Sequence, residues 1–246
     1  LFMVVAACVA VGLAKAGVSV AGLFLAAGLI NALVAIYLYR LVPEFFLRFL
    51  AWLAVHSIYR LKKVDLHHIP PAGPALLVCN HVSYADALIL MAACPRPVRF
   101  VMEYDIYRLP VVKQLCRAAG VIPIAPARQN VAVLKQAFED IHKALASGDL
   151  VAIFPEGRIT ENGEIQPFQN GLKRILSAQA VPVVPLALRG LWGSFFSRKY
   201  GRAMSRPFIR GFLSPIEVLA GEPVAAEEAT PEHLQEKVAK LRGEKL

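Results

Sequence analysis

The chain has 246 residues, which is room for one large domain or for a smaller domain with an appendage. Its composition is 57% hydrophobic, too apolar for an ordinary soluble domain, and this indicates membrane contact. Lysine and arginine number 27 against 18 acidic residues, a formal charge of +9. Together with the apolar composition, this excess favours an anionic membrane surface over nucleic acid as the partner. The cysteines are scattered without C-x-x-C spacing, which argues against a disulfide framework or a zinc site: Cys8, Cys79, Cys94 and Cys116.

Residues 1–42 are predicted to form a transmembrane helical hairpin, as a fragment of a larger membrane domain. The stretch from Ala16 to Tyr39 carries no charge and exceeds the ~20 residues that span a bilayer core. A second uncharged run precedes it, with Lys15 at the connection. A signal peptide is the alternative, but it would have a basic leader and a single short apolar core. Basic residues follow Tyr39, so the positive-inside rule predicts that everything downstream lies in the cytoplasm, at the inner membrane.

Residues 43–63, "PEFFLRFLAWLAVHSIYRLKK", are predicted to form an interfacial amphipathic helix. Pro43 suits the first turn of a helix. Aromatic and leucine side chains give a broad apolar face, and the basic residues are available to lipid headgroups: Arg48, Arg60, Lys62 and Lys63. The alternative is a core helix of the domain that follows.

Residues 64–246 are predicted to form one α/β domain, because short apolar runs alternate with helical patterns. The expected strands are 75–80, 98–102, 121–124, 150–154 and 182–188, with a further outer strand within 206–218. The expected helices are 84–95, 110–120, 130–148, 171–180 and 230–243. This alternation predicts a mostly parallel sheet flanked by helices on both faces.

The loop after the strand 75–80 carries Asn80, His81, Ser83 and Asp86. Loops at the carboxyl ends of parallel strands build the site in such sheets. A histidine can act as a general base, and a carboxylate on its other ring nitrogen fixes the tautomer. The structural alternative is that Asp86 only favours the N-terminus of the next helix, with His81 an ordinary loop residue. Ser83 is a poor candidate nucleophile, because it lies two residues from its base on a tight loop.

Two further loops carry basic residues. After the strand 150–154, "FPEGRIT" presents an arginine, backbone N–H groups and a hydroxyl together, and arginine binds phosphate in a bidentate manner. The residues concerned are Pro155, Glu156, Gly157, Arg158 and Thr160. The third loop, "PIAPARQN", brings Arg128 to the start of a helix, whose positive end also suits an anion. His67 and His68 are adjacent and do not face one site, so no metal site is predicted.

The order "NHVSYAD", then "FPEGRIT", then "VPVVPLAL" resembles the glycerolipid acyltransferase family, over roughly residues 61–218. The family more often reads F-P-E-G-T-R-S, and the variant here resembles its 2-acylglycerophosphoethanolamine acyltransferase branch. The resemblance implies that His81 is the base and Asp86 its orienting acid. It implies that Glu156, Gly157 and Arg158 hold the acceptor's phosphate. The hairpin suits a further resemblance, to lysophospholipid transporters fused ahead of such an acyltransferase.

The resulting hypothesis is acyl transfer from a thioester, acyl-CoA or acyl-acyl carrier protein, to the free hydroxyl of a lysophospholipid. The acceptor is 1-acyl-glycerol-3-phosphate or 2-acylglycerophosphoethanolamine, and no metal or further cofactor is required. One alternative is a non-catalytic lysophospholipid-binding module that regulates a membrane transporter, against which the intact His81–Asp86 pair argues. A lipid esterase is another, but the chain lacks a G-x-S-x-G nucleophile motif.

Overall fold

The structure is a computed structural model that describes residues 9, 11–12, 15, 17–41, 43–204 and 213–243. The chain divides into two compact units, Leu1–Phe46 and Leu47–Leu246.

The first unit contains one long helix, α2 (Val20–Leu41). Its segment Val20–Leu38 has a mean hydropathy of 2.2 and is long and apolar enough to cross a membrane. Large apolar side chains along it are exposed, including Phe24 and Leu33. Most of the preceding run, residues 1–16, lies outside the described residues, so the hairpin stays a prediction, and the described residues show one apolar helix long enough to span a membrane.

The segment predicted as one interfacial helix, residues 43–63, forms two elements. Helix α3 (Pro43–Ile58) ends five residues early, and Tyr59–Val64 is strand β1. This strand pairs in parallel with β7 (Ser214–Ala220) at the edge of the sheet. The prediction failed because the basic residues of "YRLKK" were assigned to lipid headgroups. Lysine is instead common on edge strands, where its charge opposes pairing with other chains.

Helix α3 has a buried face and an exposed apolar face. Ala51 and Val55 are buried, as expected of a core helix. Phe49 and Trp52 are 55% and 45% exposed, as expected of an interfacial one. Arg48, however, donates a 2.7 Å hydrogen bond to the carbonyl of Cys94.

The second unit is built on a seven-stranded sheet in the order β1-β7-β6-β2-β5-β3-β4. The remaining strands are β2 (Ala75–Cys79), β3 (Val98–Glu103), β4 (Ile122–Ile124), β5 (Leu150–Ile153) and β6 (Val183–Arg189). All neighbouring pairs are parallel except β6 with β7. The predicted mostly parallel sheet is therefore confirmed. The predicted outer strand is β7, which lies inside the edge strand β1, and residues 205–212 before it are outside the described range.

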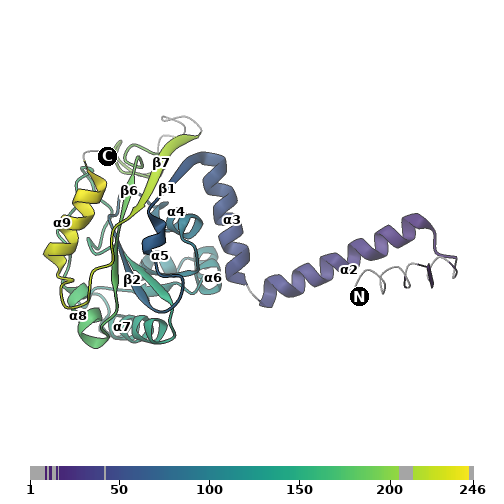
Figure 1. The fold of residues 1–246 in the computed structure, drawn as a ribbon, viewed down its shortest axis with the longest axis horizontal. Helices are drawn as coiled ribbons and strands as arrows, with labels where there is room; N and C mark the ends of the chain where they lie inside the picture. Colours follow the sequence, from purple (N-terminus) through teal and green to yellow (C-terminus); the bar gives the residue numbers. More distant parts are fainter. Residues whose placement is uncertain are drawn as a thin grey trace. The chain divides into compact units, whose positions relative to one another are not determined.

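Helices cover both faces of this sheet (Figure 1). They are α4 (Asp86–Ala93), α5 (Tyr104–Tyr107), α6 (Pro110–Ala118), α7 (Val131–Ala146), α8 (Gly171–Ala178) and α9 (Pro231–Arg242), with a 3-10 turn η1 at Leu66–His68. The sequence missed only the short α5 and η1 among these.

Strand β2 shows how the two hydrophobic cores arise. All five of its residues are buried, and successive side chains point to opposite faces. Leu77 belongs to the core beneath α4 and the end of α3, while Leu76 belongs to the core beneath α7, α8 and α9. The sequence of a strand that is buried on both faces is a continuous apolar run. The first polar residues after that run mark where the chain leaves the sheet.

Candidate active site

The first of those polar residues, Asn80, fastens the end of β2 to β6. Its side chain is fully buried, donates to the carbonyl of Leu188 at 3.1 Å and accepts from the Leu188 N–H at 2.8 Å. Asn80 therefore fixes the point at which the chain leaves the sheet.

His81 and Asp86 meet as predicted. The Nδ1 atom of His81 lies 2.8 Å from Oδ2 of Asp86. The carboxylate is fully buried, whereas the imidazole is 21% exposed. No described residue bonds the other ring nitrogen, Nε2, which therefore remains available to a ligand. An imidazole bonded to a carboxylate on one nitrogen and open on the other has the arrangement of a general base.

Asp86 is held by the loop that it closes. Its Oδ2 atom accepts hydrogen bonds from the backbone N–H groups of Val82 and Ser83 at 2.7 and 3.0 Å. The hydroxyl of Ser83 donates to Oδ1 at 2.5 Å. Asp86 also opens helix α4, so the structural alternative describes part of its role. The hydroxyl proton of Ser83 is therefore directed at Asp86.

Phe154 is a part of the site that sequence reasoning missed. Its ring stacks on the His81 imidazole, with centroids 4.2 Å apart and planes inclined by 18°. This contact and the Asp86 bond together fix the plane of the imidazole. The sequence did carry a signal for this residue, because Phe154 begins the "FPEGRIT" loop at the end of the neighbouring strand β5.

Glu156 does not have the position expected of a phosphate-binding residue. It is 4% exposed, and both carboxylate oxygens are taken by backbone donors. Oε1 accepts from the N–H of His81 and Oε2 from the N–H of Gln166, each at 2.7 Å. Burial raises the pKa of Glu156, and these two N–H groups oppose the rise. Glu156 thus ties the "FPEGRIT" loop to the histidine loop and is a positioning residue.

Thr160 is likewise structural. It is 1% exposed, and its hydroxyl lies 3.0 Å from Oδ1 of Asn162 and 2.8 Å from the carbonyl of Glu164. The same hydroxyl accepts from the N–H of Gly163 at 3.1 Å. The Thr160 N–H bonds the carbonyl of His81 at 3.0 Å. The hydroxyl of Thr160 is thus engaged inside its own turn, and its contact with a phosphate stays a prediction.

Arg158 faces outward from this loop. Its side chain is exposed and makes no hydrogen bond or ion pair with the described residues. Gly157 precedes it with φ of +71°, and its N–H bonds the carbonyl of Phe154 at 3.0 Å. Pro155 is buried, and its carbonyl accepts from Gln169. The glycine therefore supplies a tight turn that presents Arg158, while its own N–H is not open to a phosphate.

Arg128 is not brought into this cluster by any polar contact within the described ranges. It lies in the exposed turn between β4 and α7. Strand β4 is the far edge of the sheet, separated from β2 by β3 and β5. At about 4.8 Å per strand, the ends of β4 and β2 are roughly 14 Å apart. The side-chain oxygen of Asn130 caps α7 by accepting from the N–H of Val133.

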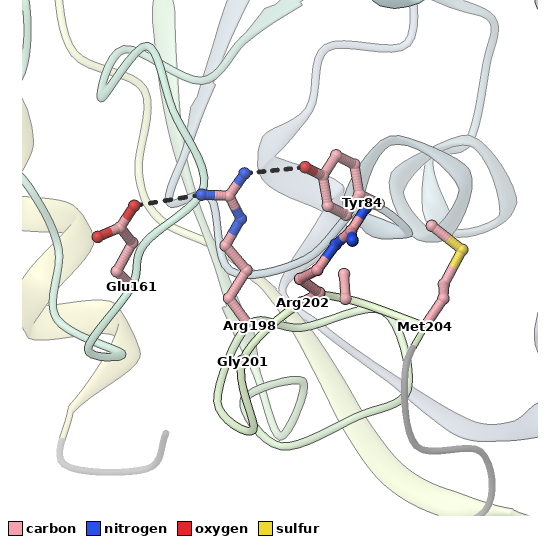
Figure 2. Close-up of a pocket in the computed structure, with 7 residues that line it drawn as sticks. Tyr84, Glu161, Arg198, Gly201, Arg202 and Met204 are labelled. Carbon is pink, nitrogen blue, oxygen red and sulfur yellow. Dashed lines mark hydrogen bonds and ion pairs between the residues drawn. The ribbon is translucent and has the colours of Figure 1, made fainter.

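The loop after β6 supplies residues that sequence reasoning did not single out. Arg198 donates to the Tyr84 hydroxyl at 3.0 Å and pairs with Glu161 at 3.2 Å (Figure 2). The hydrogen bond to Tyr84 is the main cause of a raised pKa of Arg198. These three residues line a pocket of about 640 Å³ together with Gly201, Arg202, Ala203 and Met204. Tyr84 follows His81 by three residues, so this pocket adjoins the histidine loop.

The three described cysteines are buried. Burial raises the pKa of Cys79 well above its ordinary value and that of Cys94 to about 12. Cys79, Cys94 and Cys116 are free, and Cys8 lies outside the described residues. Within the described ranges, no three histidine, cysteine or acidic side chains come together as a metal-binding group.

Comparison with known proteins shows the family to which this chain belongs. Residues 60–189 match the sequence profile of the family described as Acyltransferase. The chain is 28% identical over 193 residues to the 1-acyl-sn-glycerol-3-phosphate acyltransferase alpha of Mus musculus, covering 76% of this chain and 64% of that one. It is 31% identical over 154 residues to the chloroplastic 1-acyl-sn-glycerol-3-phosphate acyltransferase BAT2 of Brassica napus, covering 61% and 43%. The chain thus spans less than two thirds of the length of these relatives.

The fold also has a solved counterpart. The crystal structure of the 1-acyl-sn-glycerophosphate (LPA) acyltransferase of Thermotoga maritima superimposes with a TM-score of 0.55 at 18% identity, covering 74% of this chain and 70% of that one. At 18% sequence identity, the similarity between the two structures shows a shared fold. The profile match covers more than half of the chain and includes the histidine loop, the "FPEGRIT" loop and β6. The chain is therefore a member of the glycerolipid acyltransferase family.

Proposed function

We propose that this chain transfers a fatty acyl group from an acyl thioester to the free hydroxyl of a lysophospholipid. The observation that carries the proposal is the His81–Asp86 pair, with Nδ1 bonded at 2.8 Å and the imidazole 21% exposed. A buried carboxylate that accepts from His81 and from the loop backbone holds one tautomer. In that tautomer Nε2 carries the lone pair that a base needs.

In the proposed mechanism, Nε2 of His81 takes the proton of the acceptor hydroxyl as its oxygen attacks the thioester carbonyl. Asp86 stabilises the imidazolium that forms. The tetrahedral intermediate collapses with cleavage of the carbon–sulfur bond, and the imidazolium returns its proton to the departing thiolate. The new ester bond and the free thiol balance the reaction without a covalent acyl-enzyme. General-base assistance of this kind contributes ~10²–10⁴ in rate.

Arg158 is proposed to bind the acceptor's phosphate. It is exposed, it is presented by the turn at Gly157, and it follows the strand next to β2. A guanidinium can bind two phosphate oxygens at once. We propose 1-acyl-glycerol-3-phosphate or 2-acylglycerophosphoethanolamine as the acceptor, since both carry a phosphate beside a free glycerol hydroxyl.

The protein is proposed to act at the cytoplasmic face of the inner membrane. The apolar helix Val20–Leu38 would hold the chain in the bilayer, and the exposed aromatic residues of α3 would lie at the interface. Attachment suits the chemistry, because the acyl chains of acceptor and product reside in the membrane. A lysophospholipid-binding module without catalysis is less consistent with these features, because it would have no need of the His81–Asp86 pair.

The proposal is tested by product formation. The purified protein is incubated with a panel of lysophospholipids that differ in headgroup, each with acyl-CoA and with acyl-acyl carrier protein. The products are followed by mass spectrometry. We expect at least one lysophospholipid to gain one acyl chain. If none gains an acyl chain with either donor, the enzymatic proposal fails and the binding module becomes the better account.

A further inference from the structure

The order of the strands places His81 between two loops that both carry arginine. Strands β5 and β6 flank β2, and both run parallel to it. Their carboxyl ends therefore lie at the same edge of the sheet as His81. Arg158 follows β5 on one side, and Arg198 and Arg202 follow β6 on the other. The general base thus has a separate cationic group on each side.

The loop after β6 is attached firmly to the histidine loop. Ser83 and Ser197 form an antiparallel bridge, and the N–H of Tyr84 bonds the carbonyl of Phe196 at 3.1 Å. Ser197 is buried, and its hydroxyl accepts from the N–H of Gly193 at 2.9 Å. The pocket beside Tyr84 is therefore built on backbone that is fixed relative to His81.

The charges of this pocket suit an anionic ligand. Of the seven described residues that line it, two are arginines, and the one acidic residue among them, Glu161, is paired with Arg198. Arg202 is exposed and makes no hydrogen bond or ion pair with any described residue. The volume of about 640 Å³ lies within the range of small-molecule sites. A ligand with a phosphate and an uncharged arm would use Arg202 directly and Arg198 beside it.

We infer that this pocket binds a phosphate of the acyl donor, in the phosphopantetheine arm that both acyl-CoA and acyl carrier protein present. This inference rests on the proposed function. Acyl transfer brings together two anionic substrates, and like charges repel one another at short range. Separate arginines on opposite sides of His81 hold the two phosphates apart while the hydroxyl and the thioester meet at Nε2. Arg158 takes the acceptor's phosphate, which leaves the β6 side to the donor.

The first test is direct binding, which needs no turnover. Calorimetry on the full-length protein in detergent compares 4′-phosphopantetheine with pantetheine, which differ only by the phosphate. The phosphorylated compound is expected to bind at least tenfold more tightly, and Arg202→Gln to remove most of that difference. Arg202→Lys should restore part of it. Lys199→Gln is the matched control, because Lys199 lies on the same loop but does not line the pocket.

A second test uses a substitution that should strengthen the binding of the phosphorylated compound. Glu161→Gln removes the acidic side chain found among the described lining residues and releases Arg198. This variant should bind 4′-phosphopantetheine several-fold more tightly than the wild type, with pantetheine unchanged. Equal binding of the two compounds to the wild type, or equal losses in Arg202→Gln and Lys199→Gln, would overturn the inference.

Kinetics then distinguish the source of the phosphate. With S-acyl-4′-phosphopantetheine as donor, Arg202→Gln should raise the donor KM about tenfold and leave the acceptor KM unchanged. A rise in the acceptor KM alone would assign the pocket to the acceptor and overturn the inference. If Arg202→Gln lowered only the binding of anionic vesicles, the pocket would belong to the membrane-binding surface, and the inference would also be overturned. If the wild type acylates no lysophospholipid yet prefers 4′-phosphopantetheine in calorimetry, the proposed reaction fails while the phosphate site stands.

Discussion

At the scale of single residues, Asp86 combines a catalytic contact with a structural one. Its two oxygens accept from the imidazole, from two backbone N–H groups and from the Ser83 hydroxyl. In Asp86→Asn the amide oxygen can take the place of Oδ2, and the amide NH₂ can donate to Ser83. We expect the fold to survive and kcat to fall by about 10²-fold or more, because the imidazolium loses its carboxylate. Steady-state kinetics and thermal denaturation together check this.

Asp86→Ala provides the contrast for that prediction. Alanine leaves the N–H groups of Val82 and Ser83 without their buried acceptor, so this variant should also lose thermal stability. Asp86→Asn with unchanged kcat would show that the carboxylate charge has no part in the reaction.

The raised pKa of Glu156 predicts that the stability of the folded chain depends on pH. Burial raises its pKa in the folded chain above the ordinary value of 4.5, so the unfolded chain ionises first as the pH rises. The folded chain then holds more protons than the unfolded one, and its stability falls with rising pH across the interval from 4.5 to the raised pKa. Glu156→Gln cannot ionise and lacks this contribution. Thermal denaturation in detergent should therefore show the melting temperature of the wild type, relative to Glu156→Gln, falling as the pH is raised through that interval. A relative rise would contradict the assignment.

The residues of the site differ in how far sequence could predict them. The contact between His81 and Asp86 was predicted correctly, because the two residues are five positions apart on one short loop. Glu156 and Thr160 were predicted to lie in the site region, but their roles were not. A loop motif does not reveal whether a carboxylate faces a ligand or the N–H of a residue 75 positions earlier. That choice depends on how the β2 and β5 loops meet in the folded sheet.

At the scale of elements, helix α9 holds the loop that carries Arg158. Arg242 donates to the carbonyl of Gly163 at 2.8 Å and pairs with Glu164 at 3.0 Å, and Gln235 accepts from the N–H of Phe168 at 3.1 Å. Because Arg242 is only 9% exposed, Arg242→Ala should destabilise the protein by ~1.5–3 kcal/mol, as for other hydrogen bonds to charged groups. Denaturant unfolding checks this. Lys240→Ala, an exposed position on the same helix, is the control and should change stability by less than about 0.5 kcal/mol.

Strand β1 shows where an element was misassigned. Burial alternates at its start, with Tyr59 buried, Arg60 exposed and Leu61 partly buried, and this period of two is typical of a strand. The sequence carries that signal for only a few residues, directly after a helix. Long-range pairing decided the outcome, because β7 lies more than 150 residues later and supplies the hydrogen bonds. The strands β2, β5 and β6 were predicted closely because burial on both faces makes each a continuous apolar run.

At the scale of the whole molecule, the apolar first unit should govern membrane attachment. A truncated chain beginning at Pro43 keeps α3 and the complete sheet but lacks the helix Val20–Leu38. Starting at Val64 would instead remove most of β1 and expose β7. In liposome flotation, the chain beginning at Pro43 should float less than the full chain, with a residual fraction retained by the exposed aromatic face of α3. Equal flotation of both would remove the proposed role of the first unit.

His81 is proposed to act as the general base of acyl transfer, and replacing it by alanine tests this role. The turnover number is measured with lysophospholipid and acyl thioester both saturating, in vesicles, for the wild type, His81→Ala and the exposed control His67→Ala. We predict that His81→Ala lowers kcat by ~10²–10⁴-fold with the acceptor KM nearly unchanged, while His67→Ala retains wild-type kcat. A His81→Ala variant that keeps most of the wild-type kcat would contradict the account.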